Sequence, residues 1–207
     1  MGTDIKTKRK EIMTSKTAGQ IQELGEHIEE VSGKKVRDKV MEGSETIAKS
    51  SNKEKVALWM KDAIDRLDDC TTPEKCKQIM GACGHACIAR AAGLANGIKN
   101  RRLKYKTEAD FLKAEIKKPV KGIRLEQKGK TLVHYYTPHT YSTPRRCFCS
   151  LMNALPEGVN VSPTYCQCSR AFVEKYWEGA LGRPVKAEVV ATPLTTGADE
   201  CKFIIHL

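Results

Sequence analysis

The chain has 207 residues, of which 40% are hydrophobic and 29% charged, a balance that fits a globular protein and excludes wholesale disorder. Its formal net charge is +11, from 36 Lys and Arg against 25 Asp and Glu. Because nine cysteines are an odd number, a framework in which every cysteine is paired within one chain is excluded.

The N-terminal residues, MGTDIKTKRK, lack the apolar stretch of a secretory signal peptide. The least polar segment, residues 81–98, is interrupted by His85 and Arg90, so we expect no membrane-spanning segment. These features predict a cytoplasmic protein whose cysteines stay reduced. Reduced cysteines are explained by metal binding, by redox chemistry or by burial as small apolar side chains.

The first half of the sequence predicts helices. Apolar residues recur at helical spacing over residues 20–31, and Gly33 marks a plausible end. Thr72-Pro73-Glu74 is typical of a helix start, with an N-cap, a proline at the first position and an acid in the first turn. The further helices are expected over residues 36–50, 53–69, 72–92 and 107–117.

A basic segment follows at residues 99–130, which carry 12 basic and 4 acidic residues, a net charge of +8. Such a segment either binds nucleic acid, an acidic partner or an anionic ligand, or is a solvated connector. Within the densest basic run, residues 99–106, Tyr105 is the one aromatic residue, and a single aromatic residue makes a poor stacking platform. We therefore favour the connector and do not expect a nucleic-acid partner.

The pattern changes near Pro119 to the period-2 alternation of strands. Strands are expected over residues 120–126, 131–136, 145–151, 185–191 and 201–207, with a helix over 162–182. The fold class is α+β, a helical N-terminal half followed by an antiparallel sheet with a long packed helix. We divide the chain into a helical region, 1–118, and an α+β region, 119–207, that together form one compact unit.

Cysteines recur along the helix expected at 72–92. Cys76, Cys83 and Cys87, with Met80, are spaced so that they line one helical face. Cys83 and Cys87 predict a thiolate pair that binds a soft metal or acts in redox chemistry. The alternative is a stripe of small residues that lets another helix approach closely.

Two further cysteine pairs each have one residue between them. Cys147 and Cys149 lie on an expected strand, and Cys166 and Cys168 lie at the start of an expected helix. Two such pairs in one half of the chain indicate a shared thiolate site. Zinc, which takes four ligands from Cys, His or carboxylate side chains, suits such a site.

The last forty-odd residues combine a cysteine pair, a turn, a strand acid and a closing motif: Cys166-Gln-Cys168, Leu181-Gly182-Arg183-Pro184, Glu188 and Gly197-Ala-Asp199-Glu200-Cys201-Lys-Phe203. This pattern resembles the 4-vinyl reductase family, also called the hydrocarbon-binding family, over roughly residues 130–207. The resemblance implies an α+β fold, a homodimer and a buried pocket for a small apolar molecule.

In relatives that sense aromatic compounds, zinc is held by a helix Cys, a strand Glu, a Cys at the end of that strand and the Cys of the closing motif. Cys166 or Cys168, Glu188 and Cys201 match three of these positions, and the remaining one falls near Pro193, which cannot bind metal. Cys147, Cys149 or the other member of the Cys166/Cys168 pair could supply the missing ligand. The candidate zinc ligands are therefore Cys147, Cys149, Cys166, Cys168, Glu188 and Cys201. The candidate pocket residues are Tyr135, Phe148, Phe172 and Tyr176, which could equally be plain core.

The same region is also similar to 2-amino-thiazoline-4-carboxylic acid hydrolases. That resemblance makes Cys166 or Cys168 a nucleophile, with His134 or His139 as its base. The leading hypothesis is a protein that binds a small apolar molecule and holds a thiolate-rich zinc site. The alternatives are a cysteine-dependent hydrolase of a C–N bond in a small cyclic substrate, and a metal or redox protein using Cys83 and Cys87.

Overall fold

The computed structural model describes the backbone of residues 2–137 and 146–207, and the side chains from residue 16 onward within these ranges. The chain forms two compact units, residues 1–79 with 145–164 and residues 80–144 with 165–207. This division differs from the boundary predicted at residue 118. The helix that begins at Pro73 continues from one unit into the other, and a later segment of the chain belongs to the first unit.

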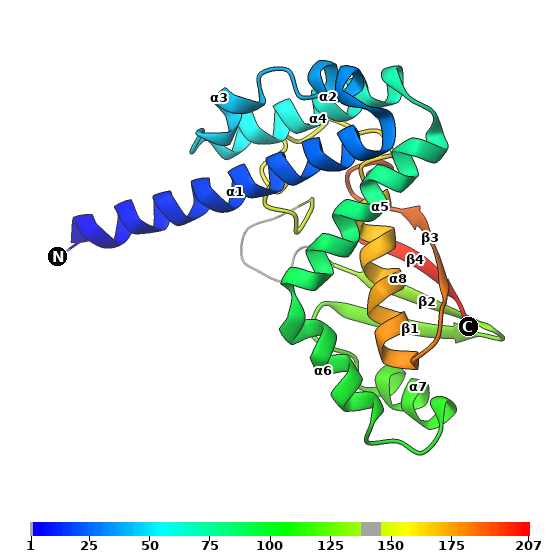
Figure 1. The fold of residues 1–207 in the computed structure, drawn as a ribbon. Helices are drawn as coiled ribbons and strands as arrows, with labels where there is room; N and C mark the ends of the chain where they lie inside the picture. The colour runs from blue at the N-terminus through cyan, green and yellow to red at the C-terminus, as the bar shows by residue number, and fades with distance from the viewer. Residues whose placement is uncertain (1, 138–145) are drawn as a thin grey trace. The chain divides into compact units, whose positions relative to one another are not determined.

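The first unit is mainly helical (Figure 1). Its helices are α1 (Gly2–Ser32), α2 (Lys34–Val40), α3 (Ser44–Ala48), α4 (Lys53–Cys70) and the first part of α5 (Pro73–Arg90). The helix predicted over 20–31 is confirmed as part of the longer α1, which ends just before Gly33 at φ +84°. The single helix predicted over 36–50 is wrong, because Gly43 adopts a left-handed φ of +76° and separates α2 from α3.

The core of this unit follows the helical spacing of the sequence. Ile21, Leu24 and Ile28 of α1 are buried, as are the α4 residues Met60, Ile64 and Leu67. The helix predicted over 53–69 is confirmed as α4, and the side chain of Asn52 caps it by accepting a hydrogen bond from the Lys55 backbone N–H.

Residues 146–164 form turns and contain no strand, so the strand predicted over 145–151 is wrong for the part that the structure describes. The guanidinium of Arg146 donates to the carbonyls of Pro156 and Val159, at 2.9 and 2.6 Å. These bonds fold the segment back on itself rather than extending it.

The second unit contains the sheet (Figure 1). Its helices are the remainder of α5, α6 (Ala92–Arg102), α7 (Glu108–Lys117) and α8 (Gln167–Leu181). Its strands are β1 (Ile123–Lys128), β2 (Thr131–Tyr136), β3 (Lys186–Ala191) and β4 (Cys201–His206). They form one antiparallel sheet in the order β1-β2-β4-β3, and α8 packs against α5. The predicted α+β fold class is therefore confirmed.

The sheet has an inner face and an outer face because side chains alternate along each strand. Leu132 lies opposite Ile205, and both are buried with Phe203 on the inner face. Trp177 of α8 is 1% exposed and belongs to the same core. Large side chains from the inner face of the sheet and from α8 thus form one hydrophobic core.

Length alone does not make a helix suitable for a bilayer. Helix α1 has 31 residues, but its sequence is rich in Lys and Glu. Across residues 2–137 and 146–207, no helix combines the length and the apolar character needed to cross a membrane.

Candidate functional site

Helix α5 touches the first turn of α8 at a glycine. A Cβ atom placed on Gly84 would lie 2.2 Å from the carbonyl oxygen of Cys168 and 2.9 Å from the Cβ of Ala171. Any larger residue would therefore force the two backbones apart. The neighbouring His85 has a lowered pKa, mainly because it is partly buried and also because Lys175 of α8 lies near it.

This contact brings the backbones of three cysteines together. Cys83 directly precedes Gly84, Cys87 lies one helical turn beyond Cys83 on the same face of α5, and Cys168 lies in the first turn of α8. All three side chains are partly exposed. We call Cys83, Cys87 and Cys168 the crossing cysteines.

Positive charge accompanies the crossing cysteines. The guanidinium of Arg90 donates a hydrogen bond to the sulfur of Cys87 at 3.2 Å. Cys168 lies at the N-terminal end of α8, where the helix dipole favours negative charge. Both features suit sulfur atoms that carry negative charge, as metal-binding cysteines do.

Cys166, just before α8, has the opposite environment. It is 4% exposed, and its sulfur lies 3.3 Å from the hydroxyl of Thr192. Burial raises the pKa of the Cys166 thiol to about 11. Burial also raises the pKa of Cys201 to about 12, with smaller contributions from Cys166 and Glu200. The structure thus places Cys166 and Cys201 near each other as buried, protonated thiols.

The structure does not bring the predicted zinc ligands together as one set. Cys201 faces the inner side of the sheet, whereas Glu188 lies opposite Ile204 on the outer side and bonds to His206 at 2.8 Å. Cys147 and Cys149 belong to the first unit, and the other four candidates belong to the second. Within the described ranges, no group of three or more His, Cys, Asp or Glu side chains converges in a form ready to hold a metal ion.

The predicted nucleophile and base are also separate. Cys166 contacts Thr192, whereas His134 accepts a hydrogen bond at its Nδ1 from the indole N–H of Trp177 at 3.0 Å. Complete burial lowers the pKa of His134 to about 4, so its ring is neutral at physiological pH. His139 lies outside the described residues.

The predicted pocket residues occupy different environments. Tyr135 lies on the outer face of the sheet, where the Arg124 guanidinium stacks 3.5 Å from its ring centroid. Tyr176 is buried in the core beside Trp177, and its hydroxyl accepts a hydrogen bond from Arg101 at 3.0 Å. Phe172 packs against the same core, and Phe148 belongs to the first unit.

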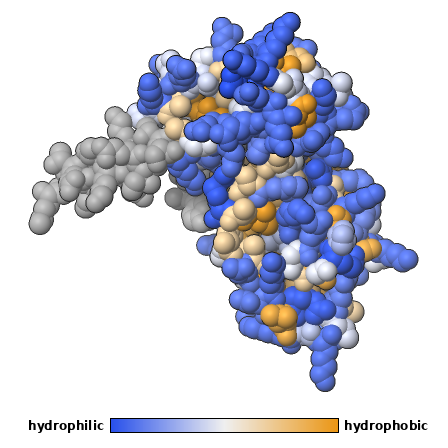
Figure 2. Space-filling view, in the orientation of Figure 1, coloured by the Kyte–Doolittle hydropathy of each residue, from blue (hydrophilic) through white to orange (hydrophobic). Residues whose placement is uncertain are grey.

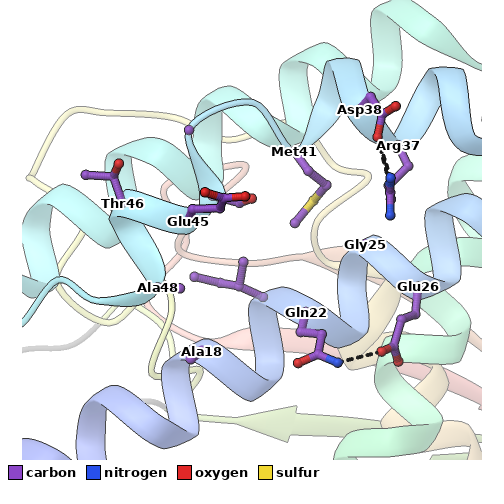
Figure 3. A pocket seen from close by; sticks show the side chains of 13 residues that line it. Ala18, Gln22, Gly25, Glu26, Arg37, Asp38, Met41, Glu45, Thr46 and Ala48 are labelled. Atoms are coloured by element: carbon purple, nitrogen blue, oxygen red, sulfur yellow. Dashed lines mark hydrogen bonds and ion pairs between the residues drawn. The ribbon is translucent and has the colours of Figure 1, made fainter.

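The first unit contains a hollow of about 730 Å³ between α1 and the α2–α3 segment (Figure 3). Ile21 and Met41 supply apolar surface, and Gln22, Glu26 and Glu45 supply polar groups. The Arg37 side chain in this hollow is bound to Asp38 at 2.6 Å and to Glu29 at 2.9 Å. The volume is within the range of small-molecule sites.

No protein-family model matches the chain, and no curated protein matches it. The resemblance to the 4-vinyl reductase family therefore stays a prediction. Two features escaped the sequence analysis. The spacing of hydrophobic residues does not reveal the hollow. The hollow forms between α1 and the α2–α3 segment, and Gly33 separates these in the sequence. Small residues were predicted to let another helix approach α5 closely, as Gly84 does with α8, but Cys168 was not identified as the residue at the contact.

Proposed function

We propose that the protein binds a soft metal ion, zinc in the first place, through the thiolates of Cys83, Cys87 and Cys168. The observation that carries this proposal is the contact of Gly84 with the Cys168 carbonyl. It joins a thiol pair one turn apart on α5 to a third cysteine from a distant part of the chain. Thiolate sulfur is the ligand that zinc and copper(I) favour.

The surroundings support these cysteines over the buried pair. The Arg90 guanidinium and the start of α8 both offset negative charge on sulfur. Burial raises the pKa of the Cys166 thiol and of the Cys201 thiol, so both stay protonated even though Cys166 is the N-cap of α8. Three thiolates leave the fourth position of a tetrahedral zinc ion to water or to another ligand. Because no three ligating side chains converge in the described residues, binding requires thiol side chains to rotate.

Cobalt(II) is a direct probe of this proposal, because it replaces zinc and gives strong sulfur-to-metal absorption when thiolates bind it. We expect this absorption in the reduced wild-type protein and its loss in the variant Cys83→Ser/Cys87→Ser. Cys168→Ser should weaken it, and removal of metal by a chelator should be reversed by added zinc.

Cys70→Ser is the matched control, because Cys70 is also partly exposed but ends α4 in the first unit. Its cobalt spectrum should equal that of the wild type. Undiminished absorption in the Cys83→Ser/Cys87→Ser variant would overturn the assignment. So would an equal loss of absorption in Cys70→Ser.

The hollow in the first unit favours a second function, the binding of a small molecule. Gly25 lines it, and a Cβ on Gly25 would lie 3.5 Å from the Met41 Cε, which is ordinary contact. Gly25→Leu should therefore fill the hollow without forcing the backbone apart. An organic molecule that copurifies with the wild type in native mass spectrometry should be lost from this variant. Retention of that molecule would exclude the hollow as its site.

A further inference from the structure

Within residues 99–121 of the second unit, two of the three carboxylates are paired with arginines. Glu115, which is buried, receives two hydrogen bonds from Arg101, at 2.8 and 3.1 Å. Glu108 is bound to Arg183 at 2.7 Å. Asp110 accepts a hydrogen bond from the Thr107 hydroxyl at the start of α7. Arginines therefore balance Glu115 and Glu108, and Asp110 is the one carboxylate of residues 99–121 that no described cation neutralises.

The lysines of residues 99–121 are exposed and form no ion pair with any residue that the structure describes. They are Lys99, Lys104, Lys106, Lys113, Lys117, Lys118 and Lys121. We call residues 99–121 the basic tip. Its surface has a positive potential, because these seven exposed lysines outnumber Asp110, the one carboxylate of the tip that no described cation neutralises.

The arginines and the two aromatic residues of the basic tip make contacts inside the unit. Arg101 bonds to Glu115, and Arg102 donates to the Tyr105 carbonyl at 2.8 Å. The Tyr105 ring packs on Phe111, with 6.0 Å between centroids, at the edge of the core. The tip thus lacks available arginine forks for base edges, and its tyrosine does not serve as a stacking surface.

Exposed apolar side chains accompany the free lysines. Leu103 is 81% exposed and lies between Arg102 and Lys104 in the sequence. Val120, between Lys118 and Lys121, is 36% exposed, and Leu94 of α6 is 41% exposed. Figure 2 shows the α6–α7 end of this unit as hydrophilic surface with small separate apolar areas. The Leu103 side chain is therefore accessible to any surface that the neighbouring lysines approach.

We propose that the basic tip binds the headgroup layer of a membrane that contains anionic lipids. Lysine ammonium groups attract anionic headgroups, and Leu103 can enter the boundary between headgroups and acyl chains. The charge complementarity favours an anionic surface, and the exposed leucine favours lipid over nucleic acid. The attachment is peripheral, and salt weakens it because the lysines are solvated.

The test is cosedimentation of the full chain with vesicles of phosphatidylcholine alone and of phosphatidylcholine mixed with phosphatidylserine. Binding is expected only to the mixed vesicles and should fall as salt is raised. A lysine near an anionic surface contributes about 1 kcal/mol, or about a five-fold change in partitioning. Lys113→Gln/Lys117→Gln, which changes two exposed residues of α7, should therefore weaken binding about 25-fold.

Lys35→Gln/Lys39→Gln is the matched control, because these exposed lysines also lie four residues apart on a helix, α2 of the first unit. It makes the same change in net charge and should leave vesicle binding unchanged. Leu103→Ser should weaken vesicle binding severalfold without changing the salt dependence.

Three results would overturn the proposal. One is no binding to the mixed vesicles, and another is an equal loss in the α2 control. The third is tighter binding to single-stranded RNA that depends on Lys113 and Lys117 but not on Leu103, which would make a nucleic acid the partner.

Discussion

Cys166 and Cys168 are separated by one residue but lie in opposite environments. The Cys166 thiol is buried beside Thr192, and its pKa is raised to about 11. Cys168 is partly exposed, and its carbonyl lies against Gly84 of α5. At the start of a helix, residues two apart point in roughly opposite directions, about 200° apart around the axis. Two cysteines at this spacing therefore lie on two different surfaces of α8 and do not form one site.

The difference separates buried thiols on one side of α8 from partly exposed thiols on the other. On the sheet side of α8, burial keeps thiols protonated and imidazole neutral, as in Cys201 and His134. On the α5 side, an arginine and a helix start surround cysteines that solvent can reach. Changes on the sheet side of α8 should therefore mainly alter stability, and changes on the α5 side should mainly alter metal binding and reactivity toward thiol reagents.

The largest effect is expected at the contact between the two helices. Gly84→Ala places a methyl group 2.2 Å from the Cys168 carbonyl, so α5 and α8 must separate. Overpacking of this kind costs about 1–3 kcal/mol, and a clash with backbone belongs at the upper end. We expect the free energy of unfolding in urea to fall by about 3 kcal/mol and cobalt binding to be lost with it.

Gly81→Ala on the same helix is the control for this prediction. A Cβ on Gly81 would lie 3.7 Å from the Arg170 guanidinium, which is ordinary contact. Since alanine is the better helix former, this variant should match or exceed the stability of the wild type. If both variants behave alike, the close approach at Gly84 does not hold the two helices together.

The fold was predictable from the sequence where local pattern and tertiary packing agree. Strands were predicted over 131–136, 185–191 and 201–207, and the structure confirms them as β2, β3 and β4 within a residue. The strand predicted over 145–151 is wrong for the described part, because Arg146 bonds to loop carbonyls and holds the segment in turns. Helix α6 escaped because Gly93 and Gly97 weaken its helical pattern.

The candidate site was less predictable, because it depends on which faces meet. Spacing placed Cys83 and Cys87 on one face of a helix, and the structure confirms that helix as α5. It could not show that Cys168 joins them, because that contact links residues far apart in sequence. Glu188 was grouped with Cys201 by motif, yet strand register puts them on opposite faces of the sheet.

A smaller effect is expected from acid on the buried side of α8. The unfolded chain protonates His134 near pH 6.5, whereas the folded protein does so only near pH 4. Between these pH values the unfolded state binds more protons than the folded state. The stability that neutral His134 contributes is therefore fully present above pH 6.5 and is lost as the pH falls toward 4. From pH 7 to pH 5 this histidine should cost about 2 kcal/mol of unfolding free energy.

Urea unfolding at a series of pH values measures this loss. His134→Gln is the comparison, because its amide oxygen can still accept the Trp177 hydrogen bond but does not titrate. The variant should show a loss between pH 7 and pH 5 that is smaller by about 2 kcal/mol. Equal slopes for the two proteins would show that His134 is not responsible for the acid sensitivity.

The smallest effect is on reactivity alone and leaves stability unchanged. With a pKa of about 11, the Cys166 thiol is ionised in about one molecule in a thousand at pH 8, and Cys201 in fewer. In metal-free native protein, iodoacetamide should therefore label Cys87 and Cys168, which solvent reaches, before it labels Cys166 or Cys201. Peptide mass spectrometry over time gives the order of labelling, and added zinc should protect Cys87 and Cys168 selectively. Early labelling of Cys166 would contradict the division of α8 into a side with buried thiols and a side with partly exposed thiols, because only an accessible thiolate reacts quickly.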